Sequence, residues 1–253
     1  MAEIVELHSV EPTFPGAAAP IFTGIDLSVR RGEFVTVVGA SGAGKSTLLR
    51  LIAGLQKPSR GTIVRNVEAG RDRRAVAMVF QEARLMPWRR VRGNVALGLE
   101  GLDIDRAERD RRVSDALGLV GLADYANRWS HELSGGQRQR VGIARALAVN
   151  PDILLMDEPF GALDAITRQG LQDELLRIWH ETGKSILFVT HDIDEAVYLG
   201  DRVLLLGGTP AHITHAYDVN ATRPRIREAA DIARVGTQVK ADLSGLFEQG
   251  GGI

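Results

Sequence analysis

The sequence contains no cysteine, only four lysines and no long apolar run. Without cysteine the chain can form neither disulfides nor thiolate zinc sites, and it cannot use a cysteine nucleophile. No apolar stretch approaches the ~18 residues that a membrane-spanning helix needs, so we expect no crossing of a bilayer. Residues 1–7 carry two glutamates and lack the basic start and apolar stretch of a signal peptide.

Charge of neither sign dominates, because 31 basic residues face 32 acidic ones and the net charge is −1. Four lysines among these 31 leave 27 arginines (31 − 4), so clusters such as Arg71, Arg73 and Arg74 are expected on a solvated surface. No global field draws this chain onto nucleic acid, and no nucleic-acid partner is expected. With 44% hydrophobic and 25% charged residues, the composition is typical of a soluble globular α/β protein.

Short apolar runs and helical spacing alternate along much of the chain. One alternating run predicts a strand with one wet face over residues 21–29. Buried strands are expected over residues 34–38, 76–80, 153–156, 186–189 and 203–206, and helices over 45–53, 165–182 and 193–198. This alternation favours a largely parallel sheet covered on both faces. Residues 82–150 are helical and polar in pattern, and after residue 208 only a short helix over 226–235 is expected.

A glycine-rich segment between a predicted strand and a predicted helix matches the P-loop pattern. Backbone N–H groups can wrap phosphates only where no Cβ blocks the approach, and the helix start adds partial positive charge. A lysine supplies a full charge to the β and γ phosphates, and a hydroxyl can ligate Mg²⁺. The plainer alternative is a turn that caps a helix. The segment is Gly39, Ala40, Ser41, Gly42, Ala43, Gly44, Lys45, Ser46 and Thr47.

Two adjacent carboxylates, Asp157 and Glu158, follow the predicted strand 153–156. Ligands bind at the carboxyl ends of strands in an open parallel sheet. Asp157 is therefore a candidate ligand of Mg²⁺. If the pleat continues, Glu158 points the other way and is a candidate general base for the attacking water. The alternative role of the pair is to cap and charge the start of the next segment.

A second glycine-rich helix start lies at Leu133, where Ser134 can cap a helix and Gly135 and Gly136 leave N–H groups open. One chain with two anion-binding helix starts suggests a site shared between two subunits. With Gln137, this segment resembles the signature sequence of ABC ATPases. The family's other motifs are also present: the resemblance assigns Gln81 to magnesium and nucleotide sensing, Asp164 to the subunit interface, His191 to the γ-phosphate and Phe14 to adenine stacking.

The resemblance covers about residues 4–207 and implies a RecA-like α/β core, an N-terminal antiparallel β subdomain and an inserted helical lobe. We expect one domain over residues 1–253. Its core with the β subdomain comprises residues 1–81 and 151–208, its helical lobe residues 82–150, and its C-terminal extension residues 209–253. The implied activity is hydrolysis of ATP with Mg²⁺ by a head-to-tail pair of chains.

Within the family, residues 81–88 (QEARLMPW), 94–99 and 161–168 resemble the nitrate, sulfonate and taurine importer group, and residues 83–85 favour its aliphatic sulfonate branch. The resemblance then implies a permease that docks near Gln81 and residues 85–88, and an indirect extracytoplasmic binding protein. It places the chain on the cytoplasmic face of the cell membrane. An exporter ATPase, a soluble ABC protein of DNA repair or translation, and a non-enzymatic regulator are the alternatives.

Overall fold

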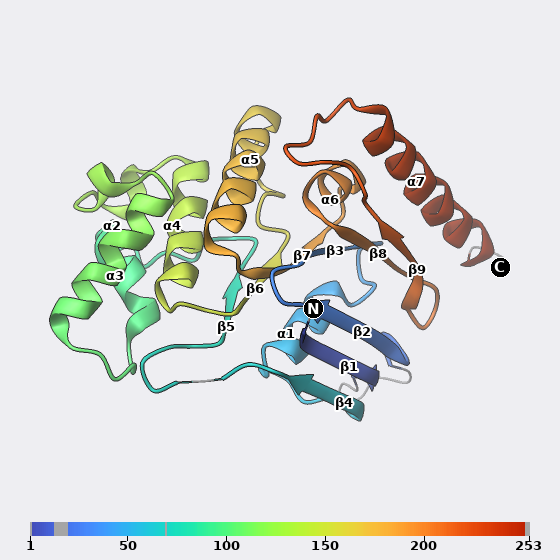
Figure 1. The fold of residues 1–253 in the computed structure, drawn as a ribbon, viewed down its shortest axis with the longest axis horizontal. Coiled ribbons are helices and arrows are strands. Elements are labelled where there is room, and N and C mark those ends of the chain that lie inside the picture. The colour runs from blue at the N-terminus through green and yellow to red at the C-terminus, as the bar shows by residue number, and fades with distance from the viewer. Residues whose placement is uncertain (1, 13–19, 69, 251–253) are drawn as a thin grey trace. The chain divides into compact units, whose positions relative to one another are not determined.

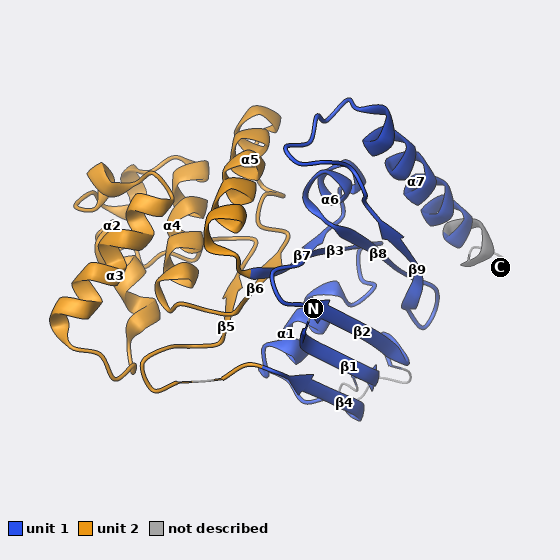
Figure 2. Ribbon diagram, in the orientation of Figure 1, with its two compact units in different colours: residues 1–66, 185–253 blue, residues 67–184 orange. Residues whose placement is uncertain are grey.

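The computed structural model describes residues 2–12, 20–68 and 70–250. It divides into two compact units (Figure 2). Unit 1 comprises Met1–Asn66 and Ser185–Ile253, and unit 2 comprises Val67–Lys184. In the described part of the chain, no helix combines the length and the apolar character that crossing a bilayer requires.

Unit 1 contains an antiparallel sheet and a mainly parallel one (Figure 1). In the first, β1 (Glu3–Glu11) pairs with β2 (Ile25–Arg30) on one side and β4 (Arg60–Arg65) on the other. In the second, β3 (Phe34–Gly39) lies between its parallel neighbours β7 (Ser185–Thr190) and β8 (Arg202–Gly207), and β9 (His212–Asp218) is antiparallel to β8. Every residue of β3 and β7 is buried, as expected for strands covered on both faces. The predicted parallel sheet and N-terminal antiparallel sheet are confirmed.

The strand expected over residues 21–29 is shorter and shifted, since β2 runs from Ile25 to Arg30. Gly24 adopts a left-handed φ of +56°, which interrupts extended structure directly before the strand. Phe22 instead forms an isolated bridge with Ala211, outside the antiparallel sheet. The local alternation of apolar residues continues through this break, so periodicity alone could not locate it.

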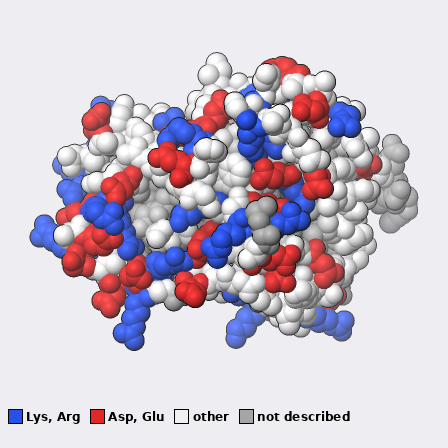
Figure 3. Space-filling view, in the orientation of Figure 1, with Lys and Arg blue, Asp and Glu red and all other residues white. Residues whose placement is uncertain are grey.

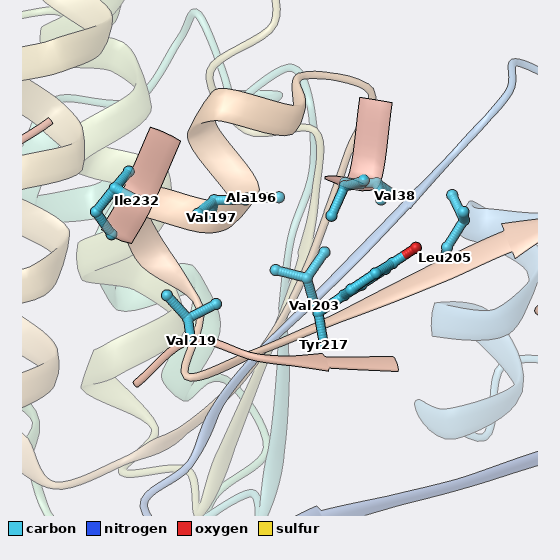
Figure 4. Packing of buried hydrophobic residues seen from close by; sticks show 9 residues of the cluster. Val38, Ala196, Val197, Val203, Leu205, Tyr217, Val219 and Ile232 are labelled. Carbon is cyan, nitrogen blue, oxygen red and sulfur yellow. The ribbon is translucent and has the colours of Figure 1, made fainter. Parts of the chain in front are cut away.

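The C-terminal part of unit 1 has more structure than the sequence analysis predicted. The short helix expected over residues 226–235 was wrong in extent, because α7 runs from Ala230 to Gly250 and Ile226 is 69% exposed before it begins. The strand β9 was not predicted. Both elements cover apolar side chains of the preceding fold, and Figure 4 shows the resulting cluster. Helix α1 (Lys45–Ile52) follows β3, and α6 (Ile193–Leu199) connects β7 to β8.

Unit 2 contains two parallel strands, β5 (Val76–Val79) and β6 (Ile153–Asp157), and four α-helices among its described residues. The helices are α2 (Val91–Ala96), α3 (Arg106–Leu119), α4 (Gly135–Ala148) and α5 (Ala165–Thr182), with 3-10 turns at Leu97–Leu99, Ala123–Tyr125 and Ser130–Glu132. The predicted bounds of α5 are confirmed, because Asp164 caps its start and Gly183 ends it at a φ of +61°.

On the face drawn in Figure 3, basic and acidic side chains intermingle.

Candidate functional site

The glycine-rich loop of unit 1 joins the end of β3 at Gly39 to the start of α1 at Lys45. Gly42 and Gly44 have φ values of +84° and +92°, a region that other residues rarely adopt. A Cβ on Gly44 would also lie 2.6 Å from the Cδ1 atom of Phe22. The loop can therefore hold this shape only with glycine at these positions, and its backbone is open to a ligand.

Lys45 lies in the first turn of α1, with 6% of its surface exposed. Its Nζ donates to the carbonyl oxygens of Gly39 at 2.9 Å and Ala40 at 3.1 Å. No acidic residue stands in the first turn of α1, and no side chain caps it at Gly44. The helix start therefore keeps its partial positive charge next to a buried ammonium, which suits an anion such as a phosphate.

His191 follows β7, the strand parallel to β3, and its side chain is exposed. Val38 of β3 lies beside Thr190 of β7, so the glycine-rich loop and His191 follow the same edge of the sheet. The turn is held locally: Thr190 Oγ1 accepts from the backbone N–H of Asp192 at 3.0 Å, and the Asp192 carboxylate accepts from the N–H of Glu195 at 3.1 Å. Unit 1 thus brings two of the predicted segments together.

Unit 2 brings together Gln81 and the two carboxylates. Val79 of β5 lies beside Met156 of β6, so Gln81 and Asp157 stand at the carboxyl edge of this strand pair. Strand β6 ends at Asp157, and Glu158 has a left-handed φ of +44°. The pleat therefore does not set the direction of Glu158. A turn does, in which the Glu158 carbonyl accepts from the N–H of Gly161. Strained backbone of this kind concentrates at functional sites.

Helix α4 supports the segment after β5 through side chains that the sequence analysis did not single out. Gln139, 4% exposed, donates to the carbonyl oxygen of Phe80 at 3.1 Å. Arg145 donates to the carbonyl of Ala83 at 2.6 Å. Burial lowers the pKa of Arg145 from its ordinary value. Because α4 begins at the signature segment, these contacts connect that segment to the one that carries Gln81.

A pocket of about 490 Å³ in unit 2 lies between Gln81, the residues that follow it, and the start of α4. Among its other lining residues are Leu85, Pro87, His131, Arg138 and Leu163. Trp88 follows in the chain with 71% of its surface exposed, whereas Leu85 and Met86 are half-buried. A hollow beside an exposed tryptophan is typical of a surface that receives a partner.

The signature segment starts α4 with a reciprocal capping box. Ser134 Oγ accepts from the N–H of Gln137 at 3.3 Å, and Gln137 Oε1 accepts from the N–H of Ser134 at 2.9 Å. Gly136 must be small, since a Cβ there would lie 2.7 Å from Thr167 Cγ2. Thr167 also donates its backbone N–H to Asp164 at 3.0 Å. The signature segment and Asp164 are therefore neighbours in unit 2.

Asp164 itself is exposed at the start of α5. Hydrogen bonds from the Thr167 backbone and side chain lower the pKa of the Asp164 carboxyl from its usual value. The side chain is therefore an anion at neutral pH, and the partial positive charge at the start of α5 stabilises it. Phe14, assigned to adenine stacking by resemblance, lies outside the described residues.

Comparison with known proteins gives the family. The profile described as "ABC transporter" matches residues 22–161, more than half of the chain. The taurine import ATP-binding protein TauB of Pseudomonas savastanoi pv. phaseolicola is 47% identical over 213 residues, which cover 83% of this chain and 81% of that protein. The aliphatic sulfonates import ATP-binding protein SsuB 1 of Xanthomonas axonopodis pv. citri is 49% identical over 243 residues, which cover 94% of each.

A solved structure agrees with these relatives. The dimeric post-hydrolysis state of the ATP-binding cassette MJ0796, bound to ADP and Pi, has a TM-score of 0.72 and 32% sequence identity to this chain. That similarity covers 86% of this chain and 100% of the other. The chain therefore belongs to the ABC transporter family, whose ATP-binding proteins hydrolyse ATP to power transport.

Proposed function

We propose that this chain binds MgATP at residues 39–47 and hydrolyses it to drive the import of organic sulfonates. One observation carries the nucleotide assignment: the loop has two left-handed glycines, and it leads into a helix start without acidic residues, where Lys45 is buried. That combination suits a multiply charged phosphate.

Each of the predicted site residues then has a separate role in ATP hydrolysis. The loop N–H groups and Lys45 bind the β and γ phosphates, and His191 contacts the γ-phosphate. Glu158 accepts a proton from the attacking water, as a general base. Gln81 orients that water and responds to the phosphate that leaves. The proton moves from the water to a Glu158 carboxylate oxygen as the water oxygen bonds to the γ-phosphorus. The bond from that phosphorus to the β–γ bridging oxygen breaks, and ADP leaves with the bridging oxygen and its electron pair.

The oxygen donors of Ser46, Asp157 and Gln81 fit Mg²⁺, which prefers hard oxygen ligands. When bound, Mg²⁺ would neutralise negative charge that develops on the phosphate groups during hydrolysis. We assign Ser46 and Asp157 as ligands, directly or through water, and Gln81 as a ligand that senses occupancy. Ser46 and Asp157 are both half-buried, which agrees with side chains that face a ligand rather than open solvent.

The signature segment would act on the ATP of a second copy of the chain. Residues 134–137 present backbone N–H groups at a capped helix start, and the small Gly136 keeps α4 close to α5. ATP then joins two incomplete anion sites, and binding closes a head-to-tail dimer. Asp164 would lie at the same interface. The dimeric state of MJ0796 with ADP and Pi supports this arrangement.

The pocket beside Gln81, together with Trp88, would receive a helix of the membrane permease. This position couples the nucleotide to the partner, because α4 contacts the chain on both sides of Gln81: Gln139 donates to Phe80 before it, and Arg145 donates to Ala83 after it. The chain would then work at the cytoplasmic face of the cell membrane, and would meet an extracytoplasmic binding protein only through the permease.

Trp88→Ala is expected to lower co-purification with the membrane subunit of the importer at least tenfold, because exposed tryptophans at interfaces are frequent hot spots. The melting temperature should stay unchanged, since the side chain is 71% exposed. Leu55→Ala is the matched control, with 67% of the residue exposed in unit 1. Co-expression and affinity purification measure the effect. Equal recovery of the permease with both variants would remove the docking assignment.

The names of two relatives, the taurine import protein and the aliphatic sulfonates import protein, support a sulfonate as the solute. Taurine is itself an aminoalkyl sulfonate, so both names refer to solutes with the same headgroup. The similarity to the aliphatic sulfonates protein covers 94% of this chain, against 83% for the taurine protein. We therefore favour unsubstituted aliphatic sulfonates, with taurine or nitrate as the alternative solute.

Deletion of the gene in the source strain is expected to abolish growth on ethanesulfonate as the sole sulfur source. Sulfate should still support growth, and the intact gene should restore growth on ethanesulfonate. A deletion strain that fails only on taurine would assign the taurine branch. Failure only with nitrate as the nitrogen source would contradict a sulfonate importer.

A further inference from the structure

Helix α6 begins two residues after His191 and has only seven residues, Ile193–Leu199. A helix this short is not stable by itself. Its first turn is held by the Asp192 cap. The position of α6 therefore also depends on the contacts at its C-terminal end. Because His191 lies between β7 and α6, the same contacts affect the orientation of His191.

The last four carbonyl groups of a helix lack partners inside the helix. In α6 all four accept hydrogen bonds. Ala196 accepts from the N–H of Gly200 at 2.9 Å, and the Thr36 hydroxyl donates to the same oxygen at 3.2 Å. Arg223 donates to the carbonyl of Leu199 at 2.6 Å. The two remaining carbonyls are satisfied by one side chain from beyond β9, that of Arg225.

The Arg225 side chain is 1% exposed and lies between β9 and α7 in the chain. Its Nη1 donates to the carbonyls of Val197 at 3.0 Å, Tyr198 at 2.9 Å and Gly200 at 2.7 Å. Its Nη2 donates to the carbonyl of Val219, just after β9, at 3.0 Å. Burial lowers the pKa of Arg225 to about 10, so the group stays charged at neutral pH. A cation at a helix C-terminus is stabilising.

Helix α7 covers the side of α6. Ile232 and Val239 are buried in one cluster with Ala196 and Val197. Figure 4 shows Ile232 together with Ala196 and Val197. At the start of α6, Lys240 of α7 pairs with Asp194 at 2.6 Å. The chain after β8 thus contacts α6 at three places. Arg225 binds its C-terminal end, Ile232 and Val239 pack along its side, and Lys240 pairs with Asp194 in its first turn.

We propose that Arg225 is a positioning residue for ATP hydrolysis: it clamps the C-terminal end of α6 and so fixes His191 at the edge of the sheet. This gives residues 209–253 a role in turnover. The inference rests on the proposed contact of His191 with the γ-phosphate. It predicts that loosening Arg225 slows turnover without weakening ATP binding, because the glycine-rich loop is not part of the clamp.

The test compares Arg225→Met and Arg225→Lys with Arg234→Met, a control on the exposed surface of α7. In the full chain, Arg225→Met should lower kcat about tenfold to a hundredfold, as small misplacements of active-site groups do, while KM for ATP changes less than about twofold. Arg225→Lys, which keeps the charge but not the fork of donors, should fall in between. Hydrogen exchange should rise in residues 192–200 and not in residues 45–52.

A double-mutant cycle separates positioning from general stability. In the His191→Ala background, followed under single-turnover conditions, Arg225→Lys should change the rate less than about twofold, because the group it positions is gone. An undiminished effect there, a wild-type kcat in Arg225→Met, or faster exchange throughout unit 1 would each overturn the inference. If Arg225→Met does not fold, Arg225→Lys carries the same comparison. Full turnover in His191→Ala alone would instead overturn the proposed role of His191.

Discussion

Glu158→Gln is expected to bind ATP normally and to lose almost all steady-state hydrolysis. Glutamine has the size of glutamate but cannot take up the proton of the attacking water. Positioned general bases contribute about 10²–10⁴-fold to rates, so kcat should fall by that factor. The fold should be unaffected, because the side chain is half-buried and glutamine adopts the same backbone at a φ of +44° with no new strain.

The measurement is phosphate release at saturating MgATP, with nucleotide affinity determined separately. Glu181→Gln is the matched control, since this glutamate is exposed near the end of α5 and pairs with Arg177, one turn earlier in the same helix. A Glu158→Gln protein with wild-type turnover would remove Glu158 as the base and would shift attention to Asp157 or a water held by Gln81.

The same variant reports on the dimer. With hydrolysis blocked, ATP stays bound, so a protein that ATP joins head to tail should accumulate as a dimer. Light scattering with and without ATP measures this. Adding Ser134→Ala removes a cap that typically contributes about 1 kcal/mol and disturbs the start of α4, so ATP-dependent dimer should decline. Persistence of the dimer in the double variant would argue against the signature segment as the second phosphate surface.

Local chemistry made part of this fold predictable. The bounds of α5 follow from an aspartate that caps its start and a glycine that ends it, both adjacent in sequence to the helix. The glycine-rich loop was recognisable in part because two of its glycines meet a local demand: Gly42 and Gly44 need a positive φ. Such requirements act over a few residues, and a single sequence displays them.

Contacts between distant segments were not predictable in the same way. Arg225 reaches carbonyls 25 to 28 positions earlier in the chain, and nothing around it distinguishes it from the other 26 arginines. The extent of α7 did leave a signal, because Ile232, Val235, Val239, Leu243 and Leu246 recur at spacings of three or four. Strand β9 left less of one, since most of its residues are partly or fully exposed at the edge of the sheet.

For Glu158, the location was predictable from the sequence but the backbone conformation was not. Its position after a buried strand was visible, and adjacent carboxylates suggested opposite faces of a pleat. The strand ends one residue too early for that, and a left-handed residue redirects the chain instead. Backbone strain at a non-glycine residue has no sequence signal, because it is imposed by the surrounding structure.

Lys45→Ala is expected to reduce ATP affinity by at least tenfold and as much as several hundredfold. Each hydrogen bond from the ammonium to a phosphate oxygen is charge-assisted and contributes about 1.5–3 kcal/mol, and 1.4 kcal/mol corresponds to a factor of ten in Kd. A second effect adds to this one. Lys45 donates to the carbonyls of Gly39 and Ala40, so its removal also takes support from the loop itself.

The loss of phosphate hydrogen bonds and the loss of support for the loop can be measured separately. Lys57→Ala removes an exposed lysine of unit 1 and controls for net charge. Calorimetric titration with ATP and with ADP then compares the three proteins. Loss of phosphate contacts should weaken ATP more than ADP, because the γ-phosphate adds charge that Lys45 faces, whereas loss of loop support should weaken both alike. Unchanged ATP affinity in Lys45→Ala would mean that residues 39–47 only cap a helix, and the nucleotide assignment would have to be withdrawn.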